Sequence, residues 1–446
     1  MTGDARSTVA PTAPIATPPA DPPRPFVSPV GLVSRSAPPL RLPGQHFTAA
    51  LVFWVLGATG IVWVAPDIAQ GLFPLPRVVA VTHLFTLGWI TTTILGALCQ
   101  FLPVALQVPI RSERLAHVSF ALHVPGVALF LGGMLASSHS TLLAGAALFG
   151  TGLLLFCGNM AVSLRRASDR NLTWWTLVGA TVSLFCTVLL GASLAGNLRW
   201  DYLGANRFLA LGVHLHIAIG GWVMLVIVGV AHRLLPMFLL SHGASERPGK
   251  IAAGLLAAGI GLLLVFHHGL TPILLGLIAL TLGGGVVAFL VQAALFFRHR
   301  KKPVLDPGLR LAAVALGHLG LALAVAPFFL TQGLAAPRIA TAYVLLLVGA
   351  PALFVAGIYY KILPFLIWFH RFGPLVGKQP VPRVVDLYDV RTGNAAVVLL
   401  ATGLMGLVIA TVTGAVGVAR PLAAIFAAGA TVVAAQMFTI SRRRPQ

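Results

Sequence analysis

Residues 83–103 read HLFTLGWITTTILGALCQFLP, twenty-one consecutive positions without Asp, Glu, Lys or Arg. An α-helix that crosses a bilayer needs about 20 mostly apolar residues, because its backbone N–H and C=O groups must pair within the segment. The whole chain has this character: 58% of its 446 residues are hydrophobic and 9% are charged, whereas roughly 25% are charged in a soluble domain. The sequence therefore predicts an all-α, polytopic membrane protein in contact with the lipid bilayer.

Apolar runs of this kind recur along the chain and predict twelve transmembrane helices. They cover residues 47–66, 78–103, 117–136, 141–163, 173–196, 208–238, 250–267, 272–297, 309–330, 340–366, 392–414 and 420–440. The segment before them is rich in Pro, Ala, Ser and Thr and has no apolar periodicity, so we expect it to be disordered. The predicted domains are a Pro-rich disordered cytoplasmic tail (1–45), a single twelve-helix membrane domain (46–440) and a basic cytoplasmic tail (441–446).

The basic residues alternate with the predicted helices. The formal net charge of +20 would suggest nucleic acid as a partner, but in a twelve-helix threading the dense clusters all fall on one side. They are the N-terminal tail, Arg111/Arg114, Arg165/Arg166/Arg170, Arg247/Lys250, 298–302, 378–391 and 442–444. Such clusters mark the cytoplasmic side. The sequence thus predicts a multi-pass protein of a bacterial-type inner (plasma) membrane, with both termini cytoplasmic and no nucleic-acid partner.

One pattern occurs on both the second and the sixth predicted helix. Residues 216–236 read HIAIGGWVMLVIVGVAHRLLP, and an offset of 133 aligns them with residues 83–103 at seven positions, including the scarce His and Trp. A weaker copy on the tenth helix has Val344 at the histidine position and keeps the glycines and the Leu-Pro foot at Gly349, Gly357, Leu363 and Pro364. Helices two, six and ten are four apart, so we expect three pseudo-repeats of four helices in a pseudo-threefold ring.

Small residues recur at every fourth position of this pattern. Gly88, Thr92 and Gly96 lie on one face of the second helix, and Gly221 and Gly229 repeat that face on the sixth. Small side chains let a neighbouring helix approach closely. We therefore expect this face of each motif helix to be packed against another helix.

Five histidines are the candidate ligands. His83 and His216 head the two motif copies, His214 lies two residues before His216, and His267 and His268 follow the seventh helix. A polar ring in hydrocarbon usually faces the bundle interior, where it binds a ligand or relays protons, and neutral imidazole suits iron and copper. At about 100° per residue, His214 and His216 point to nearly opposite faces. Hydrogen-bonded packing is the alternative role for each, and an interfacial position the alternative for His267 and His268.

With these residues the chain resembles subunit I of the heme-copper oxidases. That family has twelve helices in three groups of four, with hemes nearer the outer face. The resemblance implies heme-ligand roles for His83 and for the His214-Leu-His216 pair, and copper-ligand roles for His216 and the His267-His268 pair. In architecture it covers about residues 47–440, and its specific motifs lie on helices two, six and seven.

The sequence also departs from that family. Helix ten carries no histidine, the His-x-His pair lies on helix six, and no tyrosine follows His216 as a histidine–tyrosine cofactor would require. All ten acidic residues fall in tails, loops or helix ends, whereas a redox-driven proton pump needs proton-carrying groups inside the membrane. The resemblance therefore narrows to non-pumping relatives, including the NnrS-type proteins linked to nitric oxide.

The leading functional hypothesis is a heme b between helices two and six, held by His83 on one side and by His214 or His216 on the other. Copper or a second heme is a further candidate cofactor at His267 and His268. The expected activity is that of an oxidoreductase in electron transfer, or in binding and reduction of a diatomic gas (O2 or NO). No Cys-x-x-Cys-His motif occurs, so electrons would come from quinone or a separate cytochrome, and additional membrane subunits are further candidate partners. The alternatives are a membrane transporter or permease and a structural relative without cofactors.

Overall fold

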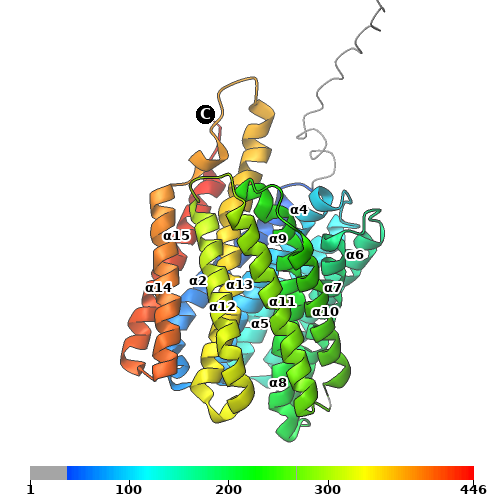
Figure 1. Ribbon diagram of the computed structural model, residues 1–446, viewed down its shortest axis with the longest axis vertical. Helices are drawn as coiled ribbons and strands as arrows, with labels where there is room; N and C mark the ends of the chain where they lie inside the picture. Colours follow the sequence, from blue (N-terminus) through cyan, green and yellow to red (C-terminus); the bar gives the residue numbers. More distant parts are fainter. Residues whose placement is uncertain (1–37, 268, 446) are drawn as a thin grey trace, which may run out of the picture.

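The computed structural model describes residues 38–267 and 269–445, and this part of the chain is a bundle of long helices (Figure 1). Twelve of its helical spans are long and apolar enough to cross a membrane, and no β-strand occurs among the described residues. The predicted all-α, polytopic architecture is confirmed. The spans are α2 (Arg41–Gln70), α3–η1–α4 (Pro76–His83, Leu84–Thr91, Thr92–Ala105), α5 (Glu113–Leu135), α6 (His139–Arg165), α7 (Leu172–Trp200), α8–η3–α9 (Arg207–His216, Ile217–Val223, Met224–Leu239), α10 (Arg247–Phe266), α11 (Pro272–Arg298), α12 (Pro307–Gln332), α13 (Pro337–Ile367), α14 (Val390–Thr413) and α15 (Val416–Arg442).

Both ends of the membrane domain extend beyond their predicted limits. α2 begins at Arg41, inside the segment predicted to be disordered, because Leu42 and Phe47 are buried in the core and hold the first turns in place. Pro43 is tolerated there, since the first N–H groups of a helix have no helical partner. Residues 1–37 of that segment lie outside the described residues. α15 runs through Arg442, so the predicted basic tail begins within a helix.

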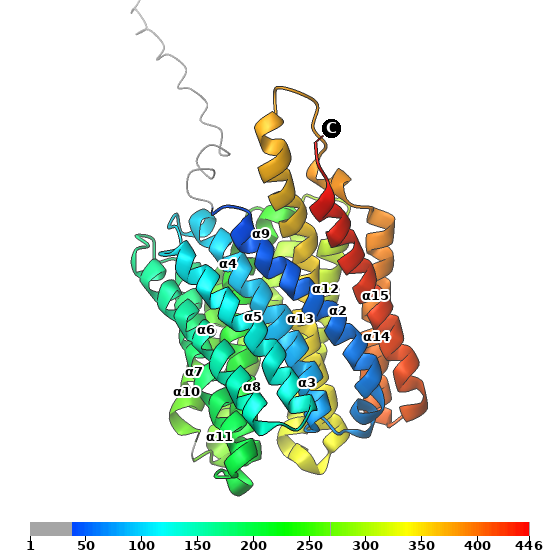
Figure 2. The ribbon, with the colours of Figure 1, turned by 180° about the vertical axis from the view of Figure 1, so that it is seen from behind.

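The packing of the helices confirms three units of four. In each unit the first helix packs against the second and the third against the fourth. The fourth helix of each unit then contacts the first helix of the next, in the pairs α6 with α7, α11 with α12 and α15 with α2. Figure 2 shows α2 beside α15, although they begin and end the described chain. These contacts close the ring that the repeat predicts.

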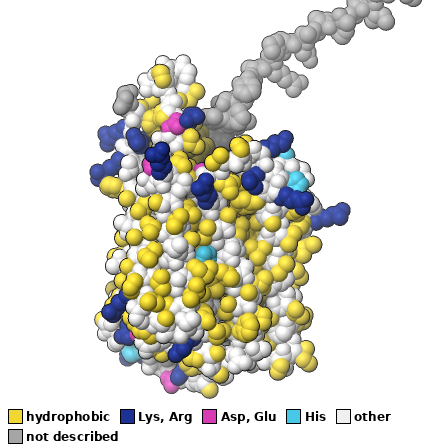
Figure 3. Space-filling view, turned by 60° about the vertical axis from the view of Figure 1, so that its left-hand side comes forward, with side chains coloured by type: hydrophobic (Ala, Val, Ile, Leu, Met, Phe, Trp, Pro, Cys, Tyr) yellow, Lys and Arg dark blue, Asp and Glu magenta, His cyan; other side chains and the backbone are white. Residues whose placement is uncertain are grey.

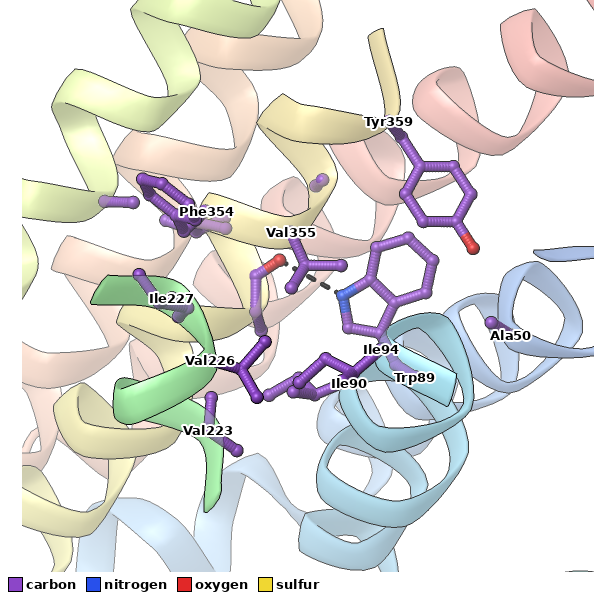
Figure 4. Close-up of a cluster of buried hydrophobic side chains, with 14 of the residues drawn as sticks. Ala50, Trp89, Ile90, Ile94, Val223, Val226, Ile227, Phe354, Val355 and Tyr359 are labelled. Carbon is purple, nitrogen blue, oxygen red and sulfur yellow. Dashed lines mark hydrogen bonds between the residues drawn. The ribbon is translucent and has the colours of Figure 1, made fainter. Parts of the chain in front are cut away.

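The three motif helices occupy the centre of this ring. In the apolar core of the second, sixth and tenth spans, 67%, 67% and 72% of the residues are buried, and no other span in the described chain exceeds 50%. Indole N–H groups join these helices: Trp89 Nε1 donates to the carbonyl of Ala352 (3.1 Å), and Trp222 Nε1 donates to Thr91 Oγ1 (3.2 Å). Figure 4 shows Trp89 in this core, among aliphatic side chains from all three helices. The Trp that the two motif copies share therefore occupies a central packing position.

The small-residue face receives the first helix of each unit, as predicted. A Cβ atom at Gly88 would lie 2.5 Å from Phe53 Cγ of α2, and one at Gly221 would lie 2.5 Å from Ser183 Oγ of α7. In the third unit, a Cβ at Gly357 would lie 2.6 Å from the carbonyl oxygen of Gly308 in α12. The equivalent glycines Gly96, Gly229 and Gly357 all meet the first helix of their unit, whereas Gly349, the third-copy counterpart of Gly88, meets Leu404 of α14. The third copy therefore keeps this packing contact at one of its two glycines, although it has no histidine.

This packing predicts the effect of adding one methyl group. We expect Gly88→Ala to lower the free energy of unfolding by about 1–3 kcal/mol, because the new methyl overlaps the Phe53 ring in a filled interface. Gly158→Ala is the matched control, since nothing lies within 4 Å of its Cβ position on the exposed face of α6. There the helix propensity of alanine should add about 0.5–1 kcal/mol. Detergent-solubilised thermal unfolding measures both, and equal stabilities of the two variants would contradict the interface.

Charged side chains gather at one end of the bundle, which we call the basic end; it carries the loops that follow the even-numbered spans. In Figure 3 the Lys and Arg side chains cluster at the upper end, the flank is largely hydrophobic, and a smaller charged group lies at the lower end. One buried network lies at the basic end. Asp306, the N-cap of α12, is paired with Lys302 (2.5 Å) and with Lys361 of α13. The side chains of Asp306 and Lys361 are 9% and 10% exposed.

Candidate functional site

The two motif histidines each stand directly before a π-helical segment. His83 is the last residue of α3 and is followed by η1, and His216 is the last residue of α8 and is followed by η3. The corresponding part of α13 is α-helical. π-helical turns are rare and often mark functional sites. The two motif copies that carry a histidine therefore also share a π-helical segment. The third copy lacks both the histidine and the π-helical segment.

His216 is held in one tautomer by its own helix. Its Nδ1 donates to the carbonyl of Gly212 (2.7 Å), so Nε2 carries the lone pair and accepts from the hydroxyl of Tyr343 in α13 (3.0 Å). The two rings are stacked at 5.9 Å, and Tyr343 is stacked in turn on Phe329 at 4.9 Å. A backbone bond at Nδ1 is how proteins orient an imidazole that ligates a metal through Nε2.

The imidazole of His216 lines an apolar cavity of about 610 Å³. Its wall is formed by residues of α8, η3, α10, α11, α12 and α13, and His216 and Tyr343 are the two polar side chains among the described lining residues. Phe208 and Leu280 belong to the same wall and are 38% and 75% exposed. The cavity therefore opens at the apolar flank of the bundle, where lipid would surround it.

His214 points to the other side of its helix, as the helical geometry predicts. A Cβ at Gly191 of α7 would lie 3.1 Å from its Cε1 atom, and its Nδ1 is buried without a hydrogen-bond partner among the described residues. The His214 ring lies within electrostatic range of His83. His83 donates from Nδ1 to the carbonyl of Val79 (2.8 Å), and its ring packs edge-on against Phe130. The structure thus brings His83 toward His214, and His216 toward Tyr343.

The five histidines do not gather into one metal site within the described residues. No three His, Cys, Asp or Glu side chains there lie close enough to hold a metal ion together. His267 follows the end of α10, where its Nδ1 bonds to the carbonyl of Leu264 (2.8 Å), and it is not among the described lining residues of the cavity. His268, the other predicted copper ligand, lies outside the described residues. The copper-ligand roles stay a prediction.

Tyr343 is the residue of this site that the sequence pattern did not point to. It lies one position before Val344, the head of the third motif copy, and it is one of five tyrosines in the chain. A search for polar residues next to the missing histidine would have found it. Its partner could not be deduced, because it depends on how α8 and α13 face each other across the centre.

The chain matches no protein-family model and no curated protein. The resemblance to subunit I of the heme-copper oxidases therefore stays a prediction that rests on the histidine motifs and the twelve-helix organisation.

Proposed function

We propose that this multi-pass membrane protein binds a heme b in the His216 cavity and acts in electron transfer, or in binding and reduction of a diatomic gas such as O2 or NO, without pumping protons. The observation that supports it is the His216 ring itself. Its Nδ1–H is bound to its own helix, and its Nε2 lone pair lies at the wall of a large apolar cavity.

The size and the apolar lining of the cavity support this proposal. Cofactor sites are mostly apolar spaces of about 300–1,000 Å³ with a few placed polar groups, and this one has about 610 Å³ with His216 and Tyr343. Arg207, whose guanidinium lies over the ring of the wall residue Phe208 at 4.9 Å, can pair with a carboxylate at the mouth. His216 would hold the iron, and the apolar wall would exclude water.

A bound heme would supply the redox chemistry and the coordination of the gas. The protein's part would be to orient the imidazole that holds the iron and to set its basicity. The bond from His216 Nδ1 to Gly212 fixes the imidazole plane and raises the basicity of Nε2. Tyr343 donates a hydrogen bond to the same Nε2 lone pair, so His216 would give up this bond in order to hold iron. The apolar opening at the flank lets a small gas enter from lipid, where such gases dissolve well.

The remaining parts of the proposal concern His83, His214 and the surroundings. The His83 and His214 rings, on α3 and α8 and within electrostatic range of each other, are a second candidate location for heme, with copper at His267 and His268. Quinone or a cytochrome would donate electrons. The proposed location is a bacterial-type inner membrane, and the charge bias supports an orientation with the basic end, and hence both termini, in the cytoplasm.

An absorption spectrum tests this proposal most directly. We expect protein purified from heme-supplemented bacterial cells to show a Soret band, and hemin titrated into heme-free protein to saturate at one heme per chain or two. Metal analysis of the same sample measures copper. A preparation that has no Soret band and does not respond to hemin would contradict heme binding, and would favour a transporter or a cofactor-free relative.

A further inference from the structure

A second large cavity lies at the basic end, between α7, α9 and α10. It has a volume of about 620 Å³, and its charged wall residues are Arg170, Arg233, Lys250 and Glu246. The wall thus has three cationic side chains and one carboxylate. The carboxylate of Glu246 faces His232, with Glu246 Oε2 3.6 Å from His232 Nε2. None of the three cations makes an ion pair within the described part of the chain. We call this cavity the basic groove.

The basic groove continues from its cations into the apolar part of the bundle. Along α9 its wall runs from Arg233 to Leu225, a rise of about 12 Å, and along α10 from Lys250 to Ala257, about 10 Å. The floor is made of small residues, and nothing lies within 4 Å of a Cβ placed on Gly254. The groove therefore combines a cationic entrance at the level of lipid headgroups with an open apolar channel at the level of acyl chains.

One side of the groove is bordered by a tryptophan at the same level as the cations. Trp175 is 60% exposed and lies one turn into α7, beyond Arg170. Tryptophan prefers the boundary between headgroups and hydrocarbon. Its position indicates that the cations lie at the membrane surface and that Leu225 and Ala257 lie within the hydrocarbon.

We propose that the basic groove binds an anionic glycerophospholipid, with its phosphodiester among Arg170, Arg233 and Lys250 and an acyl chain along Leu225, Gly254 and Ala257. Basic pockets between transmembrane helices on the surface rich in Lys and Arg suit such headgroups. The formal excess of two cations selects against a zwitterionic lipid, and the apolar channel gives a lipid an advantage over a free phosphate. This site is separate from the His216 cavity and does not depend on heme.

Retention of lipid by the purified full-length protein tests this proposal. The detergent-solubilised protein is incubated with equal amounts of phosphatidylglycerol and phosphatidylcholine, and bound lipids are counted by native mass spectrometry. We expect one preferentially retained phosphatidylglycerol. The double variant Arg233→Gln/Lys250→Gln should bind phosphatidylglycerol roughly ten- to thirty-fold more weakly. The reason is that each of the two cations near the membrane surface contributes a similar share of the attraction to the anionic headgroup.

Two further variants separate the groove from general surface charge. Arg298→Gln/Lys301→Gln removes the same charges from exposed positions of the basic end outside the groove, and should bind phosphatidylglycerol as the wild type does. Gly254→Leu keeps every charge but fills the channel, and should weaken binding of the lipid. Glycerol phosphate and inorganic phosphate should not displace the lipid at equal concentration.

Each contrary result overturns a stated part of the proposal. Equal retention of phosphatidylcholine would exclude selection by charge. Equal losses in the two double variants would exclude the groove as the site, and displacement of the lipid by inorganic phosphate would identify a small-anion site. Unchanged binding by Gly254→Leu would exclude the acyl channel.

Discussion

Replacement of His216 by alanine is expected to abolish heme binding in the His216 cavity. Among the described residues that line the 610 Å³ cavity, His216 is the one side chain with a nitrogen lone pair available to iron. Loss of an outer hydrogen-bond partner of a ligand costs about 10- to 100-fold in affinity, so loss of the ligand should lower hemin affinity by more than about 100-fold. The Soret absorbance per chain and a hemin titration of the purified variant measure this.

Tyr343→Phe is the matched control for that variant. It keeps the ring that stacks on Phe329 but removes the hydroxyl that competes for His216 Nε2. Hemin affinity should therefore stay equal or rise, and the Soret band should persist. Heme that survives in His216→Ala but is lost in both His83→Ala and His214→Ala would move the site to the His83 and His214 pair. A similar loss in Tyr343→Phe and His216→Ala would indicate a general packing defect.

The Asp306→Asn variant should be the most destabilising of the charge-neutralising substitutions at the basic end. It leaves Lys361, whose side chain is 10% exposed, without its carboxylate partner inside the bundle. Breaking a buried ion pair by removing one member costs about 3–5 kcal/mol, because the other charge stays buried without a partner. Asp386→Asn is the matched control: it breaks the exposed pair with Arg383, for which about 0–1 kcal/mol is expected. Chemical or thermal unfolding in detergent measures both, and equal losses would contradict a stabilising network.

The same network makes part of the stability dependent on pH. Burial works against ionisation of Asp306, but Lys361 and Lys302 outweigh it and hold the pKa of this carboxyl below its ordinary value of 3.8. A carboxyl with a lower pKa in the folded state contributes stability above its unfolded-state pKa and loses it as pH falls through the folded value. The difference in stability between the wild type and Asp306→Asn should therefore be complete near neutral pH and shrink below about pH 4.

Most of the fold could be predicted from the sequence, because membrane spans are decided by local composition. The twelve apolar runs, the 133-residue offset and the weaker third copy of the motif are sufficient to predict the helix count, the three units and the packed glycine face. The start of α2 could not be predicted in this way. Leu42 and Phe47 extend the helix through tertiary contacts, and a search for apolar runs does not detect such contacts. The burial of Lys361 depends in the same way on Asp306, which is distant in sequence.

The candidate site was predicted less completely, because it depends on which helix faces meet. The opposite orientations of His214 and His216 follow from helical periodicity alone. Helical periodicity does not show which neighbours they face. His214 faces toward His83, and His216 faces Tyr343, because of the way α8 packs between α7 and α13. The π-helical segments have no signal in single residues. They became visible only as hydrogen-bonding geometry in the folded chain.

Those segments also determine how the protein would respond to loss of a single residue. A π turn accommodates one more residue than an α turn. Deletion of one residue within η3 should therefore let the helix continue as a regular α-helix, while the residues on its N-terminal side keep nearly the same direction relative to the Leu-Pro foot. α13 has as many residues between its motif head and its Leu-Pro foot as the sixth span, but it is α-helical throughout. Compared with His216, its head is therefore expected to be turned by about 100° and shifted by about 1.5 Å relative to the foot. The wide turn thus sets the direction in which His216 faces, and neither composition nor hydropathy records it.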